Sequence, residues 1–196
     1  MASATSSDKL ITVLNDPENF NAKHPLQSSW TLWYTGTGTT QDSWSQQLTV
    51  LTTVSTVEDF WGAYNNLVPV QQLETGSSYY FFREGVKPEW EDPHNTSGGA
   101  WVIQIMQPQR SQDDLFLNTL LATIGSCFQR HDEICGIIFA ARRVHNRISV
   151  WTKTASDKEA QESLGTQLRE LLGCSEISFK NHQNSTQSGK SYSYKV

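Results

Sequence analysis

Three stretches with helical spacing divide the chain into pairs of segments that alternate like β-strands. Apolar residues recur every three or four positions at residues 57–66, 112–129 and 156–172, which predicts three amphipathic helices. Ser55 and Ser156, each followed by Glu three residues later, are predicted to cap two of them. Strand pairs between single helices favour an α+β domain with helices on one face of an antiparallel sheet. The expected strands are residues 28–34, 48–54, 79–83, 101–106, 135–141, 148–152, 177–179 and 192–196.

The length of 196 residues suits one domain with short tails. The first residues are polar, so we expect a flexible N-terminal arm at 1–23 and a single domain at 24–196. No apolar run approaches the ~20 residues that span a membrane, and the N-terminus has no hydrophobic signal core. These features predict a cytoplasmic protein without a membrane segment.

Two of the seven tryptophans, Trp44 and Trp90, fall in loops rich in Gly, Thr, Pro and Asp. Loops usually lie on the surface, where an exposed indole is unfavourable unless a ligand or the sheet covers it. A planar base stacked on an aromatic ring contributes about 1–3 kcal/mol, and a positively charged base adds a cation–π interaction. The alternative is that one or both indoles fold back onto the sheet.

Glu91 follows Trp90 directly. One edge of guanine presents two donors, and a carboxylate can accept from both. The alternative is that Glu91 and Asp92 form a solvated acidic pair.

The net charge of −5 argues against a broad basic face for nucleic acid but allows a local nucleotide pocket.

A basic turn with Arg142, Arg143, Arg147 and His145 lies between two expected strands. Guanidinium groups suit phosphate oxygens because they are permanently charged and offer forked donors, although arginines in turns are often simply solvated. Trp151 follows closely and is either a core residue or a pocket wall.

No catalytic pattern is present: the chain lacks GxSxG, HExxH and P-loop motifs, and its five histidines are scattered. Its three cysteines have no CxxC spacing. We therefore expect no active site, no metal and no cofactor.

Five segments resemble the eukaryotic translation initiation factor 4E family, and the resemblance covers about residues 24–196. It implies a curved eight-stranded antiparallel sheet with three helices on its convex face, a monomer, and binding of the 7-methylguanosine cap of mRNA. The segments are HPLQSSWTLWY (24–34), TVEDFWGAYN (56–65), PEWEDPHNTSGGAW (88–101), LLATIG (120–125) and ISVWT (148–152).

The resemblance also implies the role of each cap-binding residue. Trp44 and Trp90 sandwich the methylated base, while Glu91 and the Trp90 backbone N–H bind its edge. Trp151 touches the N7 methyl group. The implied phosphate contacts are Arg142 and Arg147.

On the opposite face, the resemblance implies a groove for a scaffold or repressor protein. Such a partner carries a Tyr-x-x-x-x-Leu helix and binds by the helix-in-groove mode. The implied partner-binding residues are His24, Pro25, Leu26, Val57, Trp61 and Leu117.

Four residues depart from the family pattern. Ala100 stands where familiar members have an arginine, and Val144 replaces a lysine in the basic turn. Asn118 replaces a glutamate that pairs with the partner, and Lys190 falls where some members carry a phosphorylated serine.

The sequence leaves several functions open. The leading hypothesis is an initiation factor that recruits a scaffold protein to capped mRNA. A cap-binding repressor or specialised paralogue has the same pocket and a different partner. From another class, an aromatic-lined module for a different ligand would show no preference for methylated guanine. An enzyme acting on caps has no supporting residues.

Overall fold

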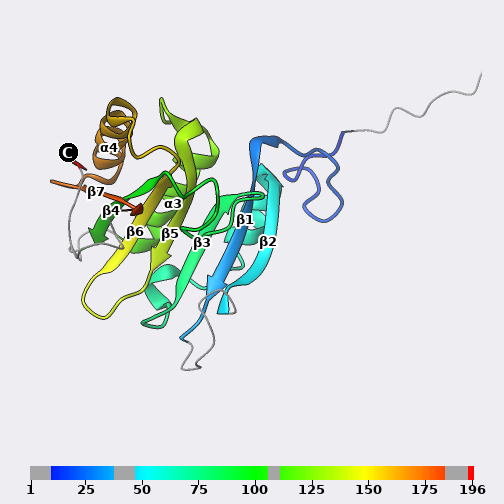
Figure 1. The fold of residues 1–196 in the computed structure, drawn as a ribbon. Helices are drawn as coiled ribbons and strands as arrows, with labels where there is room; N and C mark the ends of the chain where they lie inside the picture. The colour runs from blue at the N-terminus through cyan, green and yellow to red at the C-terminus, as the bar shows by residue number, and fades with distance from the viewer. Residues whose placement is uncertain (1–9, 38–46, 106–110, 184–193) are drawn as a thin grey trace, which may run out of the picture.

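The computed structural model describes residues 10–37, 47–105, 111–183 and 194–196. Within these residues, eight antiparallel strands form one curved sheet in the order β2-β1-β3-β5-β6-β4-β7-β8 (Figure 1). The predicted α+β class and the implied eight-stranded sheet with three helices are confirmed. The strands are β1 (Pro25–Thr35), β2 (Thr49–Thr56), β3 (Ser78–Arg83), β4 (Gly99–Ile105), β5 (Ile134–Ala140), β6 (Asn146–Thr152), β7 (Ser178–Asn181) and β8 (Tyr194–Lys195).

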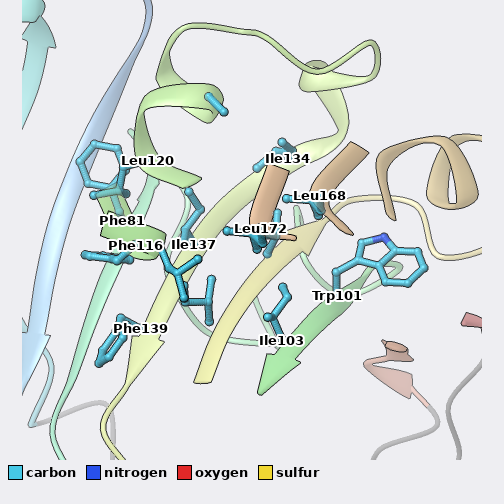
Figure 2. Close-up of a cluster of buried hydrophobic side chains, with 14 of the residues drawn as sticks. Phe81, Trp101, Ile103, Phe116, Leu120, Ile134, Ile137, Phe139, Leu168 and Leu172 are labelled. Atoms are coloured by element: carbon cyan, nitrogen blue, oxygen red, sulfur yellow. The ribbon is translucent and has the colours of Figure 1, made fainter. Parts of the chain in front are cut away.

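Three helices, α2 (Val57–Tyr64), α3 (Gln112–Ile124) and α4 (Lys158–Leu172), pack on one face of the sheet, which we call the dorsal face. Phe116 of α3 and Leu168 of α4 are fully buried there against strand residues such as Phe81 and Trp101 (Figure 2). Each fully buried large apolar side chain stabilises the fold by about 1.5–3 kcal/mol. The dorsal face therefore holds the main core.

The helix caps lie one residue later than the sequence predicts. Thr56, not Ser55, accepts a hydrogen bond from the Asp59 backbone N–H at the start of α2, at 3.1 Å. Asp157, not Ser156, accepts from the Ala160 backbone N–H at the start of α4. Thr and Asp, like Ser, are common at this position, so the sequence pattern alone could not distinguish neighbouring candidates.

Helix α3 ends earlier than the predicted residue 129. Gly125 caps it, and Ser126 adopts a positive φ of 54°, which takes the chain out of the helix. Phe128 lies after the helix but is buried in the same core. Its apolar side chain therefore matched the helical spacing, and the predicted helix was too long. No helix in the described part of the chain is long and apolar enough to cross a membrane.

Before β1, a closed loop forms in the described part of the arm. Ile11 accepts from the backbone N–H groups of Asn21 and Ala22, both at 2.9 Å, and its own N–H donates to the Asn21 side chain. This loop leads directly into His24 and β1. The expected flexibility of residues 1–23 stays a prediction.

Candidate functional site

The face of the sheet opposite to the helices, which we call the ventral face, carries a second and smaller hydrophobic cluster. Tyr80, Phe82 and Cys135 are buried in it, and Trp33 and Trp151 pack against them. None of the described strands contains Asp or Glu, although the chain has a net charge of −5. The ventral face thus combines aromatic surface with an absence of strand carboxylates, which suits an aromatic ligand with negative charge.

The loop between β3 and β4 presents Trp90 at the surface, with 51% of the residue exposed. Asn95, which is fully buried, fixes this loop: its side-chain NH₂ donates to the carbonyls of Lys87 and Glu89, both at 2.8 Å. Because these bonds tie Asn95, which follows Trp90, to carbonyls that precede it, the Trp90 backbone is held in place while its indole remains exposed.

Asp92 completes this loop and is not the solvated residue that the sequence allowed. Its carboxylate accepts from the backbone N–H groups of Lys87 and His94, both at 2.9 Å, and the His94 ring nitrogen lies at 2.9 Å. Burial acts to raise the pKa of Asp92, but these hydrogen bonds outweigh it and lower the pKa below its usual value. Glu91, in contrast, is exposed beside Trp90. The two neighbouring carboxylates therefore differ in role.

Trp151 is half-buried on the ventral side of β6. Its ring makes an edge contact with Phe82, with centroids 5.5 Å apart, and lies 4.2 Å from the ring of His182. Trp151 is therefore a wall of the ventral cluster and not a dorsal core residue.

His182 is a residue of this site that sequence reasoning missed. Its Nε2 is buried and has no hydrogen-bond partner among the described residues. Burial, with a smaller effect from the charge of Lys180, lowers the pKa of His182 to about 4, so the ring is neutral at pH 7. In the sequence, His182 lies 31 positions after Trp151, so no local pattern links the two residues. The only available signal was that His182 directly follows an expected strand.

Arg142 and Arg147 of the basic turn lie at the far end of the ventral face from Trp90, because the Trp90 loop enters β4 beside the Thr152 end of β6 and the turn lies at its Asn146 end. Arg147 and Trp151 point to the same side of β6, four residues and about 13 Å apart along the strand. Arg142 donates to the carbonyls of Ala141 and Ser77 and to the Ser78 hydroxyl, at 2.8–3.3 Å. These partners are neutral oxygens, so they fix the Arg142 guanidinium without neutralising its charge.

Trp44, the second tryptophan of the predicted cap site, lies outside the described residues.

On the dorsal side, the start of β1 is tied to the start of α2. The His24 carbonyl accepts from the Val57 backbone N–H at 2.8 Å, and Glu58 accepts from the His24 backbone N–H at 2.8 Å. The His24 ring nitrogen also lies 2.6 Å from a Glu58 oxygen. The hydrogen bonds from the side chain and backbone of His24 lower the pKa of Glu58 to about 2. These contacts bring residues 24–26 beside the first turn of α2.

The other residues implied for the dorsal groove have mixed exposure. Trp61 and Val57 are 37% and 38% exposed on α2. Leu26 and Leu117 are half-buried at the border of the main core, and Pro25 is exposed at the start of β1. Within the described residues, no group of three His, Cys, Asp or Glu side chains is arranged to hold a metal ion.

Residues 25–196 match the family model described as Eukaryotic initiation factor 4E. The "Eukaryotic translation initiation factor 4E-1" of Schizosaccharomyces pombe is 38% identical over 185 residues, which cover 92% of this chain and 85% of the relative. The "Eukaryotic translation initiation factor 4E" of Aplysia californica is 42% identical over 153 residues, covering 76% and 71%.

Solved structures share the same fold. Ascaris suum eIF4E-3, solved in complex with an m2,2,7G cap, superposes with a TM-score of 0.83 and 32% identity, covering 89% of this chain and 99% of that one. Caenorhabditis elegans eIF4E-3, solved with the 4E-binding protein Mextli and a cap analog, gives a TM-score of 0.82 and 31% identity, covering 89% and 100%.

Proposed function

This chain belongs to the eukaryotic initiation factor 4E family, and we propose on that basis that it binds the 7-methylguanosine cap of mRNA and recruits a scaffold protein for translation initiation in the cytoplasm. Solved relatives that hold a cap, and relatives that hold a cap together with a 4E-binding protein, support both activities. The proposed function is binding without chemistry on the cap.

The observation that carries the cap-binding proposal is the exposed Trp90 on a loop fixed from within by Asn95 and Asp92. A preorganised aromatic ring loses little conformational freedom when a base stacks on it, so more of the stacking energy appears as affinity. Trp44 is proposed to close the other side of the base. Glu91 is proposed to accept from the guanine edge, next to the Trp90 backbone N–H.

The rest of the ligand is proposed to follow β6. Trp151 would contact the methylated side of the base, while Arg147 and Arg142 would hold phosphates at the other end of the strand. The distance of about 13 Å between Trp151 and Arg147 leaves room for a nucleotide with its phosphate chain. The fixed charge of Arg142 would favour phosphate without a cost for ordering its side chain.

The dorsal groove is proposed to bind the partner's Tyr-x-x-x-x-Leu helix through His24, Pro25, Leu26, Val57, Trp61 and Leu117. The exposed indole of Trp61 and the exposed Val57 offer apolar surface on the outer side of α2. Because the helices cover the face opposite to Trp151, cap and partner would bind at the same time.

Retention on a 7-methylguanosine resin tests the cap site, with two matched tryptophan variants. Trp90→Ala is expected to abolish retention, while Trp61→Ala, which removes an exposed indole from the other face, is expected to be retained like the wild type. Circular dichroism checks that both variants are folded. Elution with 7-methyl-GTP but not GTP, and recovery of the eluting nucleotide unchanged, separates cap binding from a general aromatic site and from catalysis. Normal retention of folded Trp90→Ala would contradict the proposal.

A further inference from the structure

A row of residues in register crosses the ventral face at the level of Trp151. The pairing of β4 with β6 places Ala100 opposite Trp151, and the pairing of β4 with β7 places Lys180 opposite Ala100. Directly opposed residues in an antiparallel ladder project to the same side. Phe179, the neighbour of Lys180, is fully buried in the dorsal core, so Lys180 projects to the ventral side.

A single small residue, Ala100, stands between Trp151 and Lys180 in this row. Neighbouring strands lie about 4.8 Å apart, so two strand spacings, about 10 Å, separate the Cα atoms of these two residues. Only the methyl group of Ala100 lies between them in the row. The charge of Lys180 also reaches the His182 ring that packs on Trp151, where it helps to lower the pKa of that histidine.

Within the part of the chain that the structure describes, Lys180 has no partner for its charge. Among the described residues it makes no ion pair or side-chain hydrogen bond, whereas Lys195 on the next strand contacts Glu176 at 2.9 Å. The strands around Lys180 carry no carboxylate. A half-buried lysine beside an aromatic wall, with no counter-ion among the described residues, is matched by an anionic group of a ligand.

We propose that Lys180 binds a phosphate group of the capped ligand, as a second cationic contact separate from the basic turn. The inference rests on the proposed cap binding. A capped RNA offers phosphates of two kinds, those of the triphosphate bridge and the phosphodiesters beyond it. Both present the same oxygen chemistry to an ammonium group, so the ligands of the test must separate them.

The test compares wild type, Lys180→Gln, Lys180→Arg and the control Lys195→Gln. Each is titrated with 7-methylguanosine, 7-methyl-GTP and a capped trinucleotide at two salt concentrations. Lys180→Gln is expected to lower the affinity for at least one phosphate-bearing ligand by about 3- to 10-fold, the size expected for a partly solvated charge contact. It should also flatten the salt dependence for that ligand, and Lys180→Arg should restore both. Lys195→Gln removes a charge that already has a partner and should bind like the wild type.

Equal loss for 7-methyl-GTP and the trinucleotide would assign Lys180 to the triphosphate, and loss for the trinucleotide alone would assign it to a phosphodiester. Unchanged binding of all three ligands by Lys180→Gln, or an equal loss for the phosphate-free nucleoside, would overturn the inference. If the wild type binds the ligands and Lys180→Gln binds them equally well, only the role of Lys180 is wrong. If the wild type binds none of the ligands, the proposed cap binding itself is wrong.

Discussion

Trp90 and Trp61 are both exposed tryptophans, but the protein supports them in different ways. Trp61 packs edge-on against Phe60 and Tyr64 of its own helix, with ring centroids 5.2 and 6.0 Å away. Trp90 makes no ring contact within the described residues, and its position depends on the hydrogen bonds of Asp92 and Asn95. Aromatic packing supports the Trp61 indole, whereas a hydrogen-bonded polar loop positions Trp90.

This difference predicts how each site responds to mutation. Apolar contacts between neighbours on a helix are numerous and individually weak, so the dorsal surface should tolerate changes outside its anchor. A buried polar network instead depends on single groups, because each lost partner leaves a donor or acceptor without a hydrogen bond. The ventral loop should therefore be sensitive at residues that never touch the ligand.

The largest expected effect is on the dorsal side. Trp61→Ala should weaken binding of a Tyr-x-x-x-x-Leu peptide by at least ~30-fold, because interface tryptophans are commonly worth ~2 kcal/mol or more. Cap affinity should stay within a few-fold. Fluorescence anisotropy with a labelled peptide measures the first, and Trp90→Ala, which should bind the peptide normally, is the control. Undiminished peptide binding by Trp61→Ala would exclude the dorsal assignment.

Glu91→Gln should weaken cap binding by roughly 10- to 100-fold, since a charged hydrogen bond in a desolvated site is worth about 1.5–3 kcal/mol. The matched control is Glu89→Gln, which removes a carboxylate from the same loop and should have little effect. Asp92→Asn is unsuitable as a control because Asp92 holds the loop. Calorimetric titration with 7-methyl-GTP measures the effect, and equal affinities of Glu91→Gln and Glu89→Gln would remove Glu91 from the site.

Asn95→Ala tests the loop without touching the proposed ligand contacts. It deprives the Lys87 and Glu89 carbonyls of their donors, and we expect the free energy of unfolding to fall by about 1–3 kcal/mol. Cap affinity should fall with it, while peptide binding at the dorsal groove should not change. Thr96→Ala, at an exposed neighbour, should lower stability less. Normal cap affinity of Asn95→Ala would show that the loop does not need this network.

Replacing Arg142 and Arg147 together should lower the affinity for cap nucleotides, and the loss should grow with the number of phosphates. It should also reduce the salt dependence of binding. The nucleoside 7-methylguanosine should be affected little. Titrations of the mono-, di- and triphosphate at several salt concentrations measure this trend. If the nucleoside lost as much affinity as the triphosphate, both arginines would be structural.

The smallest expected effect concerns the link between His24 and Glu58. The pKa of Glu58 lies at about 2, below its ordinary value of 4.5, so its ionised form stabilises the fold. This stabilisation is complete above pH 4.5 and is lost as the pH falls toward 2. The unfolding midpoint of Glu58→Gln should therefore lie below that of the wild type at pH 6, and the two should converge near pH 2. A constant difference across this range would contradict the lowered pKa.

The sequence determined the order of the elements and an antiparallel sheet with its helices on one face. Alternation and helical spacing follow directly from strand and helix geometry, so the α+β class could be predicted from them. The position of Trp90 within a Pro- and Asp-rich loop favoured a place at the surface, and the structure decided for an exposed indole over one folded back onto the sheet. These features depend on residues that are close together in the chain, so a single sequence is enough to predict them.

Only the tertiary structure decided which residues meet across the sheet. β4 pairs with β6 and β7, and these non-sequential pairings bring Trp151, Ala100 and Lys180 into one row and place His182 against Trp151. The loop also gave Asp92 a different role from Glu91, because a carboxylate becomes structural only where backbone N–H groups converge on it. Strand pairing and loop closure depend on how the whole core packs, so no local pattern in the sequence specifies them.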